Sequence, residues 1–387
     1  MAMMASAAAH GQRERLWLWN RRWDLVFISM SVIMVGIPYF TYLGLLSVET
    51  SLAPFAARLG TSVDDLSRNV INGMVALLVG GPHMYATFSR TAMDTEFAQR
   101  RPWFLRASLL IPVVVVVLAV VNLPLLLTVF FFWASIHVLH QIVYITELYN
   151  QRQTKQLRLI SRAADYAVIL TCLYPLAAWK ISTGDFKIGL NDLSAVVGSI
   201  VPLGPWMVWA AGAAFGMALL VWLGKTVMEV RDGSIHWPKT VFIGLTVTAS
   251  FFVPALGNLD TAFQGMNLWH SFQYLALTWM INHLRWQRGE LEKSPFVRRL
   301  SADGSARSYY LFNIFLTVAD GLLAVVVFLV MRYVFGTPFD FAFDRAYYIA
   351  ILSFLWIHYY HDHFLFTQPQ VIRAEAGPAA VPATAMA

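Results

Sequence analysis

Residues 124–149, PLLLTVFFFWASIHVLHQIVYITELY, form an apolar run that contains two histidines and, near its end, one glutamate. A helix of about 20 apolar residues is long enough to cross the hydrocarbon core of a bilayer. The two histidines, His137 and His140, are three residues apart and therefore share one face of that helix. Because a polar side chain inside a lipid-spanning helix is unfavourable without a partner, this run predicts both a membrane helix and a buried site.

The composition of the whole chain agrees with this prediction. Of its 387 residues 58% are hydrophobic and 13% are charged, and the mean hydropathy is +0.57. Ordinary soluble domains carry about 25% charged residues. We therefore predict an all-α, polytopic membrane helix bundle with about ten transmembrane helices. The predicted spans are 24–47, 69–89, 104–121, 124–149, 163–179, 201–224, 240–257, 266–284, 310–331 and 346–366.

The basic residues predict the orientation of these spans. If the N-terminus is cytoplasmic, 22 of the 28 Lys and Arg residues fall on the cytoplasmic side, as the positive-inside rule requires. Both termini are then cytoplasmic, and we expect an integral protein of a bacterial-type inner membrane. The net charge of +6 resides in short loops, so it does not indicate nucleic-acid binding.

The chain divides into three predicted parts. Residues 1–23 form a cytoplasmic or interfacial lead-in, 24–367 form the transmembrane domain, and 368–387 form a disordered tail rich in Ala and Pro. The single cysteine, Cys172, excludes a disulfide within the chain and any metal site built from several cysteines.

Eight of the ten histidines lie in or at the ends of apolar runs, and all eight belong to the second, fourth, eighth and tenth spans. These four spans run in the same direction across the membrane. Most of the histidines then lie at overlapping depths, roughly 5–18 Å from the cytoplasmic face. Histidine is the commonest metal ligand in proteins, so the arrangement predicts one buried metal site. The eight are His83, His137, His140, His270, His283, His358, His361 and His363.

Helical spacing indicates which of these side chains can converge. His358, His361 and Asp362 share a face, whereas His363 points about 140° away from His358. His83 follows Gly80-Gly81-Pro82, where the proline breaks the helical hydrogen bonding and turns the histidine inward.

Three histidines are expected to lie outside the site, and one of them, His10, precedes the first span and is expected to be solvated. His283 is expected to be interfacial, because it lies on the far side of its span beside Arg285 and Trp286. His236 lies outside the spans and is expected to be solvated.

Other polar residues continue the same faces. Tyr144 and Glu147 follow His140 by four and seven residues, and Tyr274 follows His270 by four. We predict Tyr144, Tyr274 and Glu147 as catalytic residues. The predicted metal ligands are His83, His137, His140, His270, His358, His361, Asp362 and His363. Glu147 and Asp362 are either ligands or partners of the histidine N–H groups, and Asp165 and Asp320 are weaker candidates for the second role.

These motifs resemble those of the membrane β-carotene dioxygenases of the Brp/Blh type. That family carries a Gly-x-Pro-His segment, an Ile-His segment, a His-Ser-x-x-His segment and a late histidine segment, in this order. The corresponding segments are Gly80-Gly81-Pro82-His83, Ser135-Ile136-His137, His270-Ser271-Phe272-Gln273-Tyr274 and residues 358–363. The resemblance implies that His83, His137 and His270 bind a ferrous iron that splits a polyene with O2.

The chain differs from this family at two motif positions. Tyr274 replaces the second His of His-Ser-x-x-His, and Thr87 replaces an acid that follows the first motif. His140 or the 358–363 cluster is then needed as the source of the fourth ligand. The His-x-x-x-His and His-x-x-His-His boxes of membrane desaturases are not present, although enough histidines exist for two metal ions.

The chemistry of the ligands leaves several metals open. Imidazole suits zinc, copper, iron and nickel. A site in the membrane favours an apolar substrate and O2, so we expect one or two ferrous ions, with zinc or copper as alternatives. The predicted function is a metal-dependent membrane oxygenase acting on a lipid-soluble substrate such as a carotenoid or fatty-acyl chain. A metal or small-molecule transporter and a haem-binding electron carrier are the alternatives.

Overall fold

The computed structural model describes residues 16–58, 60–153, 159–188, 191–256, 259–302, 304 and 306–376. These residues are almost entirely helical, apart from a short antiparallel pair of strands, β1 (Lys187–Ile188) and β2 (Asn191–Asp192). The prediction of an all-α helix bundle is confirmed.

The helices fall into continuous rods, several of which include short π-helical or 3-10 turns. In chain order they are α2 (Arg21–Trp23), η1 (Asp24–Ser29), η2 (Met30–Val35), α3 (Gly36–Ser47), α4 (Glu49–Arg58), α5 (Val63–Val75), η3 (Ala76–Gly80), α6 (Gly81–Ala86), η4 (Thr87–Arg90), α7 (Thr95–Arg100), α8 (Pro102–Ser108), α9 (Leu110–Val121), α10 (Leu123–Gln151), α11 (Leu159–Thr171), α12 (Tyr174–Ser182), α13 (Ser194–Ile200), α14 (Trp206–Arg231), α15 (Trp237–Phe252), η5 (Val253–Ala255), α16 (Leu259–Gln287), α17 (Pro295–Ala302), α18 (Arg307–Leu329), η6 (Val330–Val334), α19 (Phe339–Thr367) and α20 (Pro369–Ala376).

Seven rods among the described residues are long and apolar enough to cross a membrane, which marks the chain as an integral membrane protein. They are Arg21–Ser47, Pro102–Val121, Leu123–Gln151, Leu159–Ser182, Trp206–Arg231, Trp237–Ala255 and Arg307–Val334. The other three predicted spans correspond to the rod from α5 to η4, to α16 and to α19. These three rods carry six of the eight histidines, and polar side chains lower their hydropathy.

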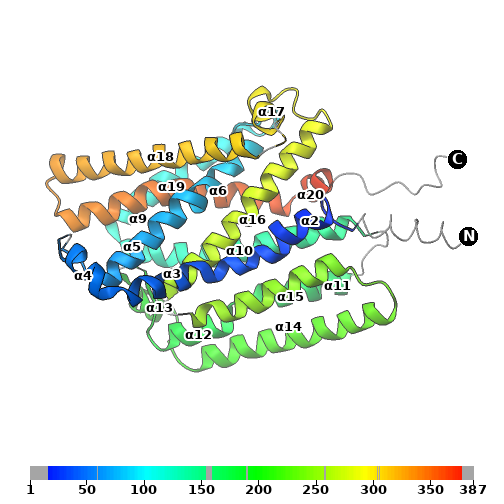
Figure 1. Ribbon diagram of the computed structural model, residues 1–387, viewed down its shortest axis with the longest axis horizontal. Helices are drawn as coiled ribbons and strands as arrows, with labels where there is room; N and C mark the ends of the chain where they lie inside the picture. The colour runs from blue at the N-terminus through cyan, green and yellow to red at the C-terminus, as the bar shows by residue number, and fades with distance from the viewer. Residues whose placement is uncertain are drawn as a thin grey trace, which may run out of the picture.

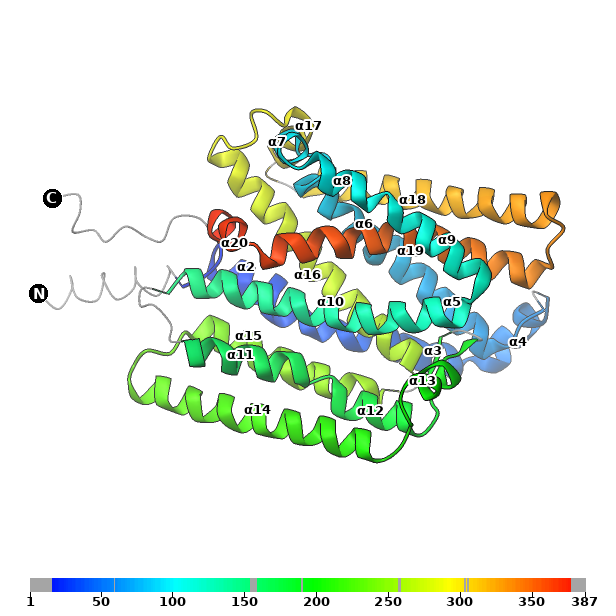
Figure 2. The ribbon, with the colours of Figure 1, turned by 180° about the vertical axis from the view of Figure 1, so that it is seen from behind.

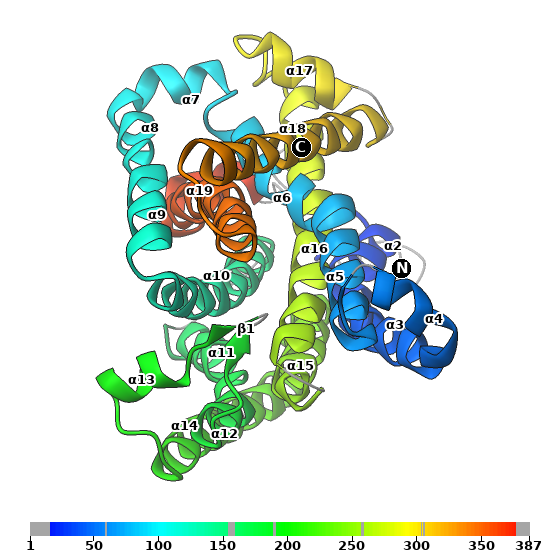
Figure 3. The ribbon, with the colours of Figure 1, turned by 90° about the vertical axis from the view of Figure 1, so that its left-hand side faces the viewer.

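The rods lie side by side along the long axis of the molecule, and α16 crosses them obliquely (Figures 1 and 2). Seen end-on, α16 runs through the middle of the bundle, with α10 and α19 on one side and α3 and α5 on the other (Figure 3). Helices α11, α12, α14 and α15 form a further group that packs against α10, and the turn η5 that follows α15 contacts α16 (Figure 3). Histidines on α6, α10, α16 and α19 therefore face a common interior.

The ends of the described chain lie at the same end of the bundle, where α2 and α20 are found (Figure 1). The predicted disordered tail is in part helix α20, which packs against α10 and α19. Residues 377–387 of that tail and residues 1–15 of the lead-in lie outside the described residues.

Local sequence explains where the central helix α10 begins. The side chain of Asn122 caps the helix by accepting a hydrogen bond of 3.1 Å from the backbone N–H of Leu125. Pro124 lies in the first turn, where a missing N–H has no helical partner to lose. Helix α10 then runs 29 residues without interruption, which places its histidines in mid-bundle.

A break in the second histidine rod turns His83 toward the interior. The chain forms a π-helical turn at Ala76–Gly80, directly before Pro82. Proline has no N–H to give to Leu78 four residues earlier, and the Leu78 carbonyl instead accepts a hydrogen bond from the Tyr310 hydroxyl. A Cβ at Gly81 would overlap the Thr317 side chain, so only glycine allows α6 and α18 to approach this closely.

Candidate metal centre

Four histidines from four helices meet inside the bundle. They are His83 of α6, His137 of α10, His270 of α16 and His358 of α19, and none is more than 4% exposed. The distances between neighbouring ring centroids are 4.7 Å (His83–His358), 4.8 Å (His137–His358), 5.0 Å (His137–His270) and 5.1 Å (His83–His270).

These separations suit coordination of one ion. A zinc-like ion lies about 2.0–2.1 Å from an imidazole nitrogen, hence about 3.2 Å from the ring centroid. Two rings bound to the same ion at angles of 90° to 109° then have centroids about 4.5–5.2 Å apart. All four observed distances fall within this interval.

Each of the four histidines has at least one buried ring nitrogen without a hydrogen-bond partner among the described residues. These nitrogens are Nε2 of His83, His137 and His358 and both ring nitrogens of His270. A buried polar group left without a partner destabilises a protein by about 1–3 kcal/mol, so several at one point indicate a ligand. Two groups of three residues have ligand atoms within 4.8 Å of one another, and they share His358: His83, His270 and His358, and His137, His358 and Asp362.

Outer hydrogen bonds fix which nitrogen faces the centre. Nδ1 of His83 is hydrogen-bonded to the carbonyl oxygen of Gly80, which can only accept, so Nδ1 carries the proton. The same nitrogen lies 2.9 Å from the Ser271 hydroxyl. The Nε2 lone pair of His83 is thereby directed toward the other three rings, as in metal sites where an outer partner orients each ligand.

His358 is held in the same way by a side-chain network. The Thr87 hydroxyl donates to Oδ1 of Asp362 at 2.8 Å, so it accepts the 2.6 Å hydrogen bond from Nδ1 of His358. The Tyr274 hydroxyl also donates to Oδ1 of Asp362, at 2.5 Å. Each of these four residues is fully or almost fully buried.

The second oxygen of Asp362 is directed toward the histidines. Oδ2 has no hydrogen-bond partner among the described residues and lies 3.6 Å from Nδ1 of His358 and 4.0 Å from Nε2 of His137. Asp362 is therefore held by one oxygen and offers the other as a fifth donor.

The remaining predicted ligands lie outside the four-ring cluster. His361 faces the rings of Phe88 and Phe104, and its Nδ1 is 3.0 Å from the Thr91 hydroxyl. His140 and His363 form a separate pair with ring centroids 5.4 Å apart, at a more exposed place between α10 and α19.

Two of the three predicted catalytic residues take part in other networks. Glu147 forms an ion pair with Arg162 and accepts a hydrogen bond of 2.6 Å from Asn150. Tyr144 is hydrogen-bonded to Arg90, at 3.1 Å, and to Glu375 of α20. Only Tyr274 contacts the metal-site network directly.

Arg90 carries a buried positive charge next to this network. It pairs with Glu375, and the two side chains are only 1% and 7% exposed. Through this pair the helix α20 is attached to the core of the bundle, beside Tyr144.

The other predicted acids and His283 lie outside the four-histidine cluster. Asp165 accepts hydrogen bonds from Lys225 and Lys239, at 2.5 and 2.9 Å, and so links α11, α14 and α15. Asp320 is buried on α18. His283 is bonded through Nδ1 to the Ser301 carbonyl, at 2.9 Å.

The prediction that His236 is solvated is wrong. It is 1% exposed and caps α15 by accepting a hydrogen bond from the backbone N–H of Lys239, at 3.2 Å. Burial, reinforced by the positive charge of Lys239, lowers the pKa of His236 to about 3.

Thr87 and Ser271 orient the ligands, and neither is among the residues that the sequence predicts for the site. In the sequence Thr87 stands out only because it replaces an acid of the resembling family. A signal is nevertheless present, since Thr87 follows His83 by four residues and Ser271 is adjacent to His270.

Comparisons of this chain with protein-family models, with curated proteins and with solved structures found no match.

Proposed function

We propose that this protein is a membrane-embedded oxygenase that holds ferrous iron and acts with O2 on a lipid-soluble substrate such as a carotenoid or a fatty-acyl chain. The observation that supports it is the convergence of four buried histidines whose inward nitrogens have no partner among the described residues. The histidine order along the chain, which resembles that of the Brp/Blh-type dioxygenases, is a second and independent support.

The donor set fits iron. Four neutral imidazoles with one nearby carboxylate leave coordination positions for small ligands on a six-coordinate ion. Bound ferrous iron would supply activation of O2 for oxidation of an apolar substrate. His83, His137, His270 and His358 would hold the ion, and Asp362 would neutralise part of its charge.

The protein's own residues prepare the site for this chemistry. Thr87 and Ser271 fix the two best-defined imidazoles through their outer nitrogens. The bundle excludes bulk water, because the four ligand histidines are nearly inaccessible. Tyr274 holds a hydroxyl proton beside the cluster, with its ring centroid 5.4 Å from that of His358.

The same geometry favours a bare ion over haem. Axial histidines of a haem lie on opposite faces of a macrocycle, whereas here four imidazoles crowd one point. His270 and His283, thirteen residues apart, are the pair with haem-like spacing in the sequence. In the structure His283 is engaged with Ser301 and stacks on Trp279.

We further propose that the rod from α5 to η4, α16 and α19 also cross the membrane, which gives ten spans and places both termini in the cytoplasm of a bacterial-type cell. These three rods have the length of a span, and five of their six histidines are buried in the bundle rather than exposed to lipid.

Metal content with stoichiometry tests the proposal. Detergent-purified wild type is expected to contain about one iron per chain, and His358→Ala is expected to lose it. His283→Gln is the matched control, because it changes a buried histidine outside the cluster, and it should retain the iron.

The reaction class is tested by O2 consumption in the presence of an apolar polyene. Wild type loaded with iron should consume O2, and the zinc-loaded protein should not. Absence of stoichiometric metal in the wild type would refute the metal centre. Accumulation of metal ions in proteoliposomes without O2 consumption would favour the transporter.

A further inference from the structure

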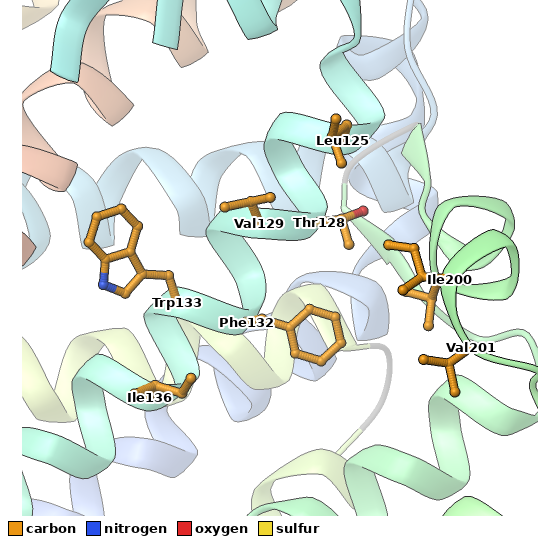
Figure 4. A pocket seen from close by; sticks show the side chains of 9 residues that line it. Leu125, Thr128, Val129, Phe132, Trp133, Ile136, Ile200 and Val201 are labelled. Atoms are coloured by element: carbon orange, nitrogen blue, oxygen red, sulfur yellow. The ribbon is translucent and has the colours of Figure 1, made fainter. Parts of the chain in front are cut away.

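Two apolar cavities lie on either side of one side chain of α10. The first has a volume of about 490 Å³ and lies between α10 and the segment that includes α13 (Figure 4). In Figure 4, Phe132 of α10 faces Ile200 and Val201 across this cavity. The second has a volume of about 140 Å³ and is lined by residues of α10, α12, α14, η5 and α16.

Phe132 belongs to the walls of both cavities. Its ring packs edge-on against Phe131, with centroids 6.1 Å apart, and against Phe186, at 6.0 Å. Phe132 is itself 36% exposed, so its ring is not locked by packing on every side. Phe132 is therefore the side chain that the two cavities share.

The walls are suited to hydrocarbon. Thr128, in the wall of the first cavity, donates its hydroxyl to the backbone carbonyl of Pro124, at 2.8 Å. Ser135, in the wall of the second, donates to the carbonyl of Phe132, also at 2.8 Å. Both hydroxyls are therefore used within α10, and the cavities present methyl, methylene and aromatic groups.

The first cavity opens on the lipid-facing side of the bundle. Helix α10 is among the rods apolar enough to cross a membrane, and the wall residues Val129, Ile136 and Ile200 are 39%, 53% and 69% exposed. In a bilayer such side chains face acyl chains, so a hydrocarbon reaches this cavity without crossing water.

The second cavity is lined by residues that are close in sequence to two of the four clustered histidines. Met266, in its wall, precedes His270 on α16 by one helical turn, which is about 5.4 Å. Val138, also in its wall, directly follows His137 on α10. The second cavity alone is smaller than the roughly 300–1,000 Å³ of ordinary ligand sites, whereas the first falls in that range. A ligand of ordinary size that enters the second cavity therefore also occupies the first.

We propose that a single long hydrocarbon chain, a polyene or acyl chain drawn sideways from the bilayer, occupies both cavities with its end at the histidine cluster, and that Phe132 is the gate between them. This inference rests on the proposed function for the identity of the reacting end. The binding of the hydrocarbon ligand depends only on the two cavities.

Photolabelling in nanodiscs tests the route. The probe is an 18-carbon fatty acid with a diazirine near its methyl end, and the protein is used with its metal removed by chelation. Mass spectrometry should find label on the α16 peptide that contains Met266, a residue that is 4% exposed. Phe132→Trp places a larger side chain between the two cavities and should lower this label at least five-fold. Phe132→Ala removes the ring and should raise the label.

A matched control is the lipid-facing phenylalanine of α18, Phe315, which is 65% exposed. Phe315→Trp should leave label on Met266 unchanged. Label confined to lipid-facing peptides in the wild type would show annular lipid only and would overturn the proposal. An equal amount of label on Met266 in the wild type and in both Phe132 variants would also overturn it. Because the labelled protein holds no metal, a failure here is separate from a failure of the oxygenase assignment.

Discussion

The hydroxyl oxygens of Thr87 and Tyr274 lie 2.6 Å apart, although the two residues are 187 positions apart in the sequence. These are the two positions at which the sequence motifs depart from the resemblance on which the proposed function draws. Both hydroxyls are bonded to Oδ1 of Asp362. Position 87 carries no acid, but the carboxylate of Asp362 on α19 lies beside it. His358, four residues before Asp362, is the fourth imidazole of the cluster.

Loss of the Thr87 hydroxyl is expected to weaken metal binding. Thr87→Val keeps the shape of the side chain but leaves Nδ1 of His358 without its partner. Removal of such an outer hydrogen bond typically lowers metal affinity 10- to 100-fold. Competition with a chromophoric chelator measures the change. Thr91→Val, one turn further along, removes a hydroxyl that contacts His361 instead and should leave the affinity unchanged; equal losses in the two variants would contradict the assignment.

Removal of the metal is expected to destabilise the protein. A ligand that binds only the folded state stabilises it by about 2.7 kcal/mol at one hundred times its Kd. Chelator should therefore lower the wild-type Tm by several degrees, and iron should restore it. His358→Ala should show no response to chelator, whereas a response equal to that of wild type would place the metal elsewhere.

The Arg90–Glu375 pair is expected to be essential for attachment of α20. Glu375→Gln leaves a guanidinium that is 1% exposed without its counter-charge. Breaking a buried ion pair in this way destabilises a protein by about 3–5 kcal/mol. Thermal unfolding in detergent measures the loss. Glu96→Gln breaks a pair with Arg100, which is 74% exposed, and should change stability by less than about 1 kcal/mol; a comparable loss would refute the special role of the buried pair.

Stability is expected to fall in acid because of His236. Its pKa is about 3 in the folded protein and about 6.5 in the unfolded chain, so the unfolded chain binds the proton first as pH falls. The contribution of His236 to the free energy of unfolding is fully present above pH 6.5. This contribution is lost between pH 6.5 and 3, at up to about 1.4 kcal/mol per pH unit. His236→Asn keeps an acceptor at the helix cap and removes this titration. The difference between the two stability profiles should follow this window, and parallel profiles would disprove it.

Close packing of α6 on α18 is expected to set the position of His83. Gly81→Ala would place a Cβ in overlap with the Thr317 side chain and 2.8 Å from the Ala76 carbonyl oxygen. We expect lower thermal stability and lower metal occupancy. Gly73→Ala, in the same rod but with open space at its Cβ, should instead be neutral or stabilising. Equal metal occupancy in all three proteins would contradict this role of Gly81.

The candidate site can be predicted in part, because helical spacing is a local property. The i, i+3 and i, i+4 relations place His137 with His140, and His358 with Asp362, on common faces of their helices. The same relations cannot say which member of a face reaches the centre. His140 meets His363 instead, since the rotation of α10 about its axis is fixed by the helices packed around it.

The sequence by itself determined the class of this protein, its helical rods and the concentration of histidines on four of them, because apolar length and helical period are properties of neighbouring residues. Only the tertiary structure decided that His83, His137, His270 and His358 form the cluster, that Glu147 is engaged by Arg162, and that Asp362 meets Thr87 and Tyr274. Those outcomes depend on how helices far apart in the chain are rotated and offset against one another. That arrangement is set by contacts such as the glycine-mediated approach of α6 to α18, which no single segment encodes.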